Sequence, residues 1–124
     1  MSTILVVDDE PGIREVIVML LQDEGYRVLQ AENGARALEL LRAEQPDLLV
    51  LDIMMPVLDG FEVLRRLREM PDFEATHVIL MSAAVRPTPD YQVAAFLPKP
   101  FELDQLLQTI HELLGESGEV REAQ

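Results

Sequence analysis

Residues 47–60, which read DLLVLDIMMPVLDG, decide the fold that this sequence predicts. Leu48–Leu51 is a run of four apolar residues with an aspartate on each side. A short apolar run bounded by polar residues is typical of a strand buried on both faces, as in a parallel sheet. A loop follows, and then Asp59–Gly60, a pair that favours a turn opening a helix. The stretch therefore predicts a strand–loop–helix unit with Asp52 at the carboxyl end of the strand.

The same alternation continues on both sides of this stretch. Apolar residues at helical spacing begin at Ile13 and stop before Gly25, which is placed to end that helix. The predicted strands are Ile4–Val7, Tyr26–Ala31, Leu48–Leu51, Val78–Met81 and Phe96–Leu97. The apolar positions of the other helices fall within residues 35–41, 61–67 and 103–114. Strands that alternate with helices predict right-handed βαβ units, and therefore a doubly wound α/β fold with a parallel sheet of five strands.

One crossover breaks this rhythm. Between Ser82 and Phe96 a helix is expected, but Pro87 and Pro89 rule out a long helix through their positions. We therefore predict a shortened or irregular fourth helix.

The size and composition fit one domain. The chain has 124 residues, of which we assign 1–115 to the domain and 116–124 to a flexible tail or linker stub. It has no cysteine, so it has neither a disulfide nor a thiolate metal site. No apolar stretch approaches the roughly 20 residues that span a bilayer. A cytoplasmic protein without membrane contact is the expectation.

The net charge of −13 argues against nucleic-acid binding by this domain, because such binding depends on neutralising phosphates. The short basic cluster Arg65, Arg66 and Arg68 lies on a predicted helix that also carries Glu62 and Glu69. We interpret this cluster as a solvated helix face.

Polar side chains follow four of the predicted strands at their carboxyl ends. They are Asp8 and Asp9, then Asp52, Ser82 and Lys99. In an open parallel sheet, ligands bind beyond these ends, so the five side chains are expected to meet in one crevice. Any one of them alone is weak evidence, whereas five at matching ends are strong.

The chemistry of this set points to phosphoryl transfer. Three neighbouring carboxylates repel one another unless a cation compensates their charge. Mg²⁺ suits such a site, since it takes one or two carboxylates together with phosphate oxygens. A carboxylate beside that cation can attack phosphorus and form an aspartyl phosphate. A lysine and a hydroxyl can then bind the new phosphoryl oxygens.

Four motifs carry a family resemblance that runs from residue 3 to about residue 114. Together they resemble the response-regulator receiver family, including its chemotaxis receivers. The resemblance implies a flavodoxin-like sheet with strand order 2-1-3-4-5. It also implies a phosphorylation-activated switch of a two-component system, whose partner is a histidine kinase or a phosphotransfer protein. The motifs are Ile4-Leu-Val-Val-Asp8-Asp9-Glu10, Leu51-Asp52-Ile53-Met54-Met55-Pro56-Val57-Leu58-Asp59-Gly60, Met81-Ser82-Ala83 and Lys99-Pro100-Phe101.

The resemblance also assigns the metal ligands and the phosphoacceptor. Asp52 is implied to accept the phosphoryl group. Asp9 and Asp52 are implied to bind Mg²⁺ directly with the backbone carbonyl of Met54, while Asp8 acts through water.

Further roles follow from the same resemblance. Lys99 is implied to pair with the phosphoryl group, and the Lys99–Pro100 peptide bond to be cis. Ser82 is the implied switch hydroxyl and Phe96 the switch aromatic. From the residues alone, an aromatic beside a strand such as Phe96 is more often an ordinary core residue.

Two other functions stay open at this point. The first is a receiver-like binding module that signals without phosphate through a remodelled fourth-helix face. The second is a metal-dependent phosphatase with an aspartyl intermediate, but it needs a second acid two residues after the nucleophile, where this chain has Met54. We expect a phosphoacceptor with at most weak autophosphatase activity, not a conventional enzyme. The altered crossover also predicts a monomer or a non-standard dimer.

Overall fold

The computed structural model describes residues 1–73, 76–84 and 92–115. Five parallel strands form one sheet in the order β2-β1-β3-β4-β5, as the resemblance implies. The strands are β1 (Thr3–Val7), β2 (Arg27–Ala31), β3 (Leu48–Asp52), β4 (His77–Ser82) and β5 (Ala95–Pro98). The helices of the described residues are α1 (Pro11–Asp23), α2 (Gly34–Glu44), α3 (Gly60–Arg68), a 3₁₀ turn (Pro71–Phe73) and α4 (Leu103–Leu114). Every predicted strand is present, and the predicted bounds differ from these by at most one residue at each end.

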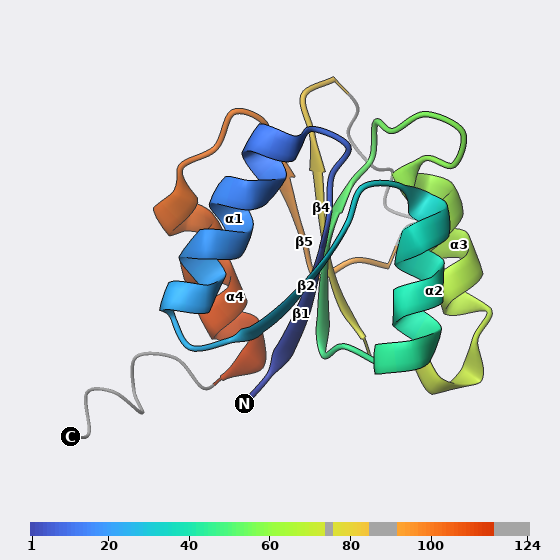
Figure 1. Ribbon diagram of the computed structural model, residues 1–124, viewed down its shortest axis with the longest axis horizontal. Coiled ribbons are helices and arrows are strands. Elements are labelled where there is room, and N and C mark those ends of the chain that lie inside the picture. The colour runs from blue at the N-terminus through green and yellow to red at the C-terminus, as the bar shows by residue number, and fades with distance from the viewer. Residues whose placement is uncertain (74–75, 85–91, 116–124) are drawn as a thin grey trace.

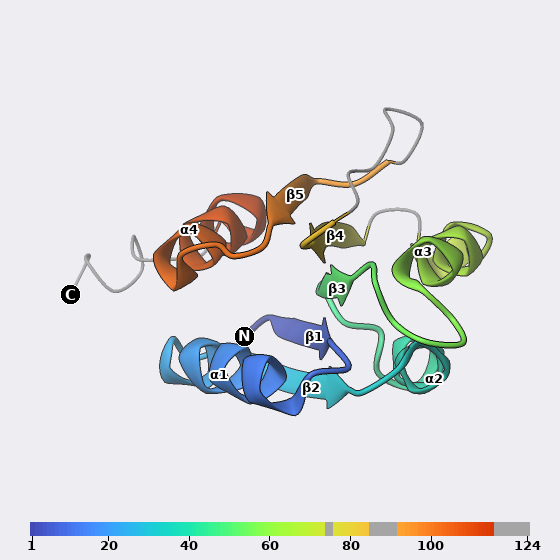
Figure 2. The ribbon, with the colours of Figure 1, turned by 90° about the horizontal axis from the view of Figure 1, so that it is seen from above.

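The helices cover both faces of the sheet, so the doubly wound α/β prediction is confirmed. Helices α1 and α4 lie on one face, and α2 and α3 on the other (Figures 1 and 2). Alternate residues of one strand pack on opposite faces: Leu5 and Val7 pack toward α2 and α3, whereas Ile4 and Val6 pack toward α1 and α4. The strands therefore read as unbroken apolar runs because both faces are covered.

The crossover between β4 and β5, which was predicted to be irregular, lies partly outside the described residues. Residues 85–91 contain both prolines on which the prediction rested, so the shape of the fourth helix stays a prediction. The described residues on either side, 83–84 and 92–94, are not helical. The Arg68 guanidinium of α3 donates a hydrogen bond of 2.8 Å to the carbonyl of Gln92. The end of the crossover is thereby tied to α3. The predicted tail, residues 116–124, also lies outside the described part.

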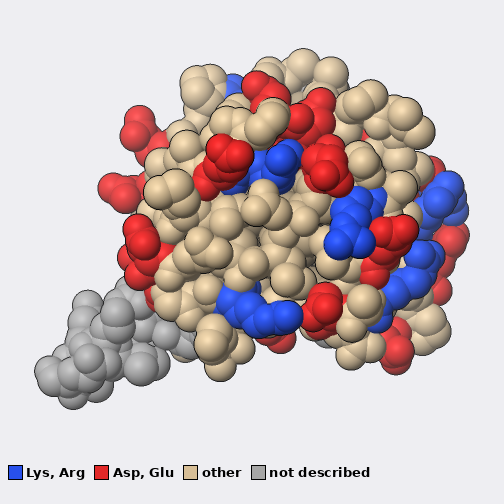
Figure 3. Space-filling model, viewed as in Figure 1, with Lys and Arg blue, Asp and Glu red and all other residues tan. Residues whose placement is uncertain are grey.

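The basic cluster of α3 is an ion-paired helix face. Arg66 Nε lies 2.8 Å from a carboxylate oxygen of Glu62, which also pairs with Arg65, and Arg65 lies 2.8 Å from Glu69. Hydrogen bonds from Arg65 and Arg66 lower the pKa of Glu62 to about 2. Figure 3 shows red and blue side chains side by side over the α2 and α3 side of this face.

In the described residues, no helix is both long and apolar enough to cross a membrane.

Val57, in the loop between β3 and α3, is a strained position. Its φ is 68°, and its side chain is fully exposed. Left-handed backbone costs an L-residue roughly 1–2 kcal/mol and suits asparagine better than a β-branched residue. We therefore expect Val57→Asn to raise the free energy of unfolding by about 1 kcal/mol, measured by urea denaturation. Val57→Thr keeps the branched shape and is the matched control. An equal gain in the threonine variant would show that strain is not the cause.

Candidate functional site

The five predicted side chains lie at the carboxyl edge of the sheet. Asp8 and Asp9 directly follow β1, Asp52 ends β3, Ser82 ends β4, and Lys99 directly follows β5. Carboxylate oxygens of Asp8, Asp9 and Asp52 all lie within 4.8 Å of one another. The topology thus brings together residues that are far apart in the sequence, because parallel strands all end on the same edge.

The Lys99 ammonium joins two of the three carboxylates. Its Nζ lies 3.0 Å from Oδ2 of Asp8 and 3.6 Å from Oδ2 of Asp52. Burial alone would lower the pKa of Lys99. The hydrogen bond to Asp8 and the negative charges of Asp52 and Asp8 outweigh burial and raise the pKa above its usual value. The lysine is therefore a fixed positive charge in this crevice.

Asp8 is held from a second direction. Its side chain is fully buried, and its Oδ1 accepts a 2.9 Å hydrogen bond from the Glu10 backbone N–H. The Arg14 guanidinium, one helical turn into α1, donates a 2.7 Å hydrogen bond to the Asp8 carbonyl. Arg14 was not predicted to belong to the site, because a lone arginine in a helix gives no signal of this contact. Asp8 is fixed in place, whereas Asp9 is exposed.

The Asp52 carboxylate is buried at the end of β3. Burial raises its pKa to about 6 from the usual 3.8. The Lys99 charge opposes this rise, and the neighbouring charges of Asp8 and Asp9 add to it. The Met54 backbone N–H faces Asp52 Oδ1 at 3.4 Å. Three acids with one ammonium leave an excess of negative charge, and such a cluster of hard oxygen ligands is typical of a Mg²⁺ site.

This shifted pKa predicts how stability depends on pH in metal-free protein. Because the folded value of about 6 exceeds the usual 3.8, Asp52 contributes stability that is fully present below about pH 3.8. That contribution is lost as the pH rises through 6. Urea unfolding in EDTA is expected to show wild type losing stability relative to Asp52→Asn over this range. Asp23→Asn, at an exposed aspartate of α1, is the control. A wild-type-to-Asp52→Asn difference that stays constant with pH would contradict the shift.

Ser82 and Phe96 lie on the neighbouring strands β4 and β5. Ser82 is buried, and its Oγ accepts a 3.1 Å hydrogen bond from the Ala84 N–H. Its carbonyl accepts a 2.8 Å hydrogen bond from the Lys99 N–H. Phe96 pairs with Leu80 in the sheet and is partly buried against the α2 and α3 core. The Lys99–Pro100 peptide bond is cis.

The helices that follow β1 and β3 begin in different ways. Asp9 does not cap α1, because the N-cap residue is Glu10 and it makes no side-chain cap hydrogen bond. Asp59 does cap α3, since its side chain accepts from the Glu62 N–H at 2.9 Å. Gly60 begins α3 directly against β3: its N–H donates to the Ile53 carbonyl at 2.8 Å. A Cβ at Gly60 would lie 2.6 Å from the Asp52 carbonyl oxygen. Sequence reasoning treated Gly60 only as a turn residue and missed this contact.

Comparisons with known proteins agree with this geometry. The family model for the response regulator receiver domain matches residues 4–111. The chain is 41% identical over 118 residues to the response regulator MprA of Mycobacterium ulcerans, covering 90% of this chain and 49% of that protein. It therefore spans about half the length of the MprA regulators that it matches.

Solved structures give the same result. Chemotaxis response regulator CheY4 of Vibrio cholerae is 30% identical with a TM-score of 0.83, covering 91% of this chain and 98% of that one. Response regulator TrrA of Thermotoga maritima, whose structure is a complex with Mg²⁺ and BeF, is 37% identical with a TM-score of 0.82. That match covers 91% of this chain and 99% of TrrA. The chain belongs to the response regulator receiver domains of two-component signalling, and Asp8, Asp9 and Asp52 form its acidic phosphorylation pocket.

Proposed function

We propose that Asp52 accepts a phosphoryl group from a histidine kinase or a phosphotransfer protein and that the domain changes shape as a result. One observation carries the proposal: the Lys99 ammonium lies 3.0 Å from Asp8 and 3.6 Å from Asp52, two members of a three-carboxylate cluster. That arrangement supplies a nucleophile and a fixed positive charge for the phosphoryl oxygens. A binding module that works without phosphate gains nothing from holding these charges together.

The carboxylates fit Mg²⁺. We assign Asp9 and Asp52 as direct ligands with the Met54 carbonyl, and Asp8 as a ligand through water. When bound, the ion supplies positive charge to the phosphoryl oxygens. Asp52 provides the attacking oxygen, while Lys99 neutralises a phosphoryl oxygen once transfer is complete. Positioning and charge stabilisation account for most of the catalysis in such transfers.

The switch itself is assigned to Ser82 and Phe96. A phosphoryl group on Asp52 offers the Ser82 hydroxyl a charged hydrogen-bond acceptor. When the hydroxyl turns toward that group, the Ala84 N–H loses Ser82 Oγ as its acceptor. Phe96 then moves into the vacated space, and the partner-binding surface changes. Hydrolysis is slow because the side chains of Met54 and Ala84, each two residues after Asp52 and Ser82 respectively, provide no general base.

The shape change is tested with beryllofluoride, which mimics an aspartyl phosphate. Amide NMR spectra are recorded with Mg²⁺ before and after beryllofluoride is added. We expect large shifts at Ser82, Ala84 and Phe96 in the wild type and none of them in Asp52→Asn. If the wild type binds beryllofluoride but these three amides do not shift, the assigned switch is wrong. If the wild type does not bind beryllofluoride at all, a binding module that works without phosphate becomes the better interpretation.

A further inference from the structure

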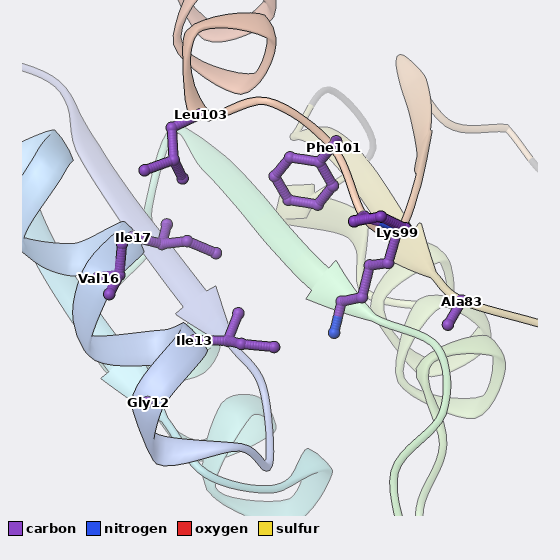
Figure 4. A pocket seen from close by; sticks show the side chains of 9 residues that line it. Gly12, Ile13, Val16, Ile17, Ala83, Lys99, Phe101 and Leu103 are labelled. Atoms are coloured by element: carbon purple, nitrogen blue, oxygen red, sulfur yellow. The ribbon is translucent and has the colours of Figure 1, made fainter.

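An apolar groove opens beside the phosphorylation pocket (Figure 4). It has a volume of about 470 Å³. One wall is α1, with Ile13, Val16 and Ile17, and the other is the segment from β5 to α4, with Phe101 and Leu103. Val16 is 49% exposed and Leu103 is 37% exposed. In the described residues, therefore, each wall of this groove, named here the α1 groove, has one apolar side chain open to solvent.

The α1 groove and the site of phosphoryl transfer share one residue, Lys99. Lys99 lines the groove, and the same ammonium lies 3.6 Å from the Asp52 carboxylate. Ala83, the residue after the switch serine, lines the groove as well. Figure 4 shows the Lys99 side chain crossing toward the end of β3, opposite Ile13. A molecule in the groove thus has apolar walls along its length and a positive charge at one end.

This combination fits an amphipathic phosphodonor. Its anionic phosphoryl group would lie at Lys99 and Asp52, and an apolar leaving group attached to the phosphorus would lie between α1 and Phe101. We propose that the α1 groove binds the leaving group of small acyl phosphates, so that donors with an apolar, ring-sized acyl group react faster than acetyl phosphate. The inference rests on the proposed function of Asp52.

The reaction is balanced without a further reagent. An Asp52 carboxylate oxygen forms a bond to phosphorus, and the bond between phosphorus and the acyl oxygen breaks. The electron pair of that bond leaves with the acyl group as a carboxylate anion. No proton is required, because both the nucleophile and the leaving group are carboxylates. With benzoyl phosphate the product is benzoate, whose ring the groove would shield from water.

The test compares benzoyl phosphate with acetyl phosphate in the presence of Mg²⁺. Initial rates of phosphorylation are measured by intact mass spectrometry on wild type, Val16→Ser and Met19→Ser. Val16 lines the α1 groove, whereas Met19 is 63% exposed on the same helix and is not among the lining residues. We expect wild type to use benzoyl phosphate about tenfold faster, because its ring buries apolar surface. Val16→Ser is expected to lower the benzoyl-to-acetyl ratio at least threefold, and Met19→Ser to keep it.

The difference in intrinsic reactivity between the two donors is the same in all three proteins. It therefore cancels when their benzoyl-to-acetyl ratios are compared. An equal ratio in all three proteins would overturn the inference while leaving Asp52 as the acceptor. If neither donor modifies the wild type, the acceptor function itself is wrong and the inference falls with it. The acetyl phosphate reaction therefore separates the two failures.

Binding is also measured without phosphorylation. Sodium benzoate is titrated into wild-type protein, and methyl NMR signals of Ile13, Val16 and Leu103 are followed. We expect these signals to shift together, and sodium acetate to leave them unchanged. Shifts that depend on protein concentration and not on benzoate would identify a second copy of the chain as the occupant and contradict the proposal.

Discussion

Replacing Lys99 with methionine is expected to slow phosphorylation of Asp52 by acetyl phosphate at least a hundredfold, about the effect of removing one preorganised charge or donor from an active site. Methionine keeps much of the apolar stem but removes the ammonium that lies between Asp8 and Asp52. The transferred oxygens then lose their fixed positive partner. The pKa of Asp52 also rises further, because the Lys99 charge is the largest influence that lowers it.

The rate is measured by intact mass spectrometry at saturating Mg²⁺, with Lys99→Arg as the matched control. Arginine restores the charge with a different geometry, so an intermediate rate is expected. A rate for Lys99→Met within threefold of wild type would show that Lys99 has only a structural role.

The second large effect concerns Gly60, where we expect alanine to lower the free energy of unfolding by about 3 kcal/mol. Its Cβ would lie 2.6 Å from the Asp52 carbonyl oxygen and 2.7 Å from the Ile53 Cα. Both neighbours are backbone atoms of the phosphoacceptor segment, so neither can turn away as a flexible side chain would. The start of α3 has to move off β3.

Gly12→Ala provides the comparison, because a Cβ there meets nothing within 4 Å. The free energy of unfolding of that variant is expected to equal the wild-type value or to exceed it by up to about 1 kcal/mol, since alanine favours a helix more than glycine does. Urea denaturation of both variants measures the difference. Similar stabilities for the two would show that the α3–β3 contact relaxes without cost.

The sequence predicted the sheet because its strands are short apolar runs with no competing pattern. Every residue in two of these runs is apolar, which indicates a strand and also allows burial on both faces of the sheet. The two runs are Leu48–Leu51 and Val78–Met81. The convergence of Asp8, Asp52 and Lys99 also followed from sequence, since parallel strands end on one edge. The strand order itself came from family resemblance, because periodicity does not specify which strands are neighbours.

Other features depend on distances that a sequence does not contain. The Gly60 contact with the Asp52 carbonyl arises from how closely α3 approaches β3. The strained Val57 gives no signal either, because a valine ordinarily favours an extended strand. The α1 groove depends on how far the segment after Lys99 lies from α1. In the sequence, an apolar residue such as Val16 indicates only that it belongs to the apolar face of a helix.

The central claim is Mg²⁺-dependent phosphorylation of Asp52. It is tested most directly by intact mass spectrometry of the chain after incubation with acetyl phosphate. Wild type with Mg²⁺ is compared with wild type in EDTA and with Asp52→Asn. The account predicts one added phosphoryl group in the first sample and none in the other two. No adduct on the wild type, or an adduct that persists in Asp52→Asn, would contradict it.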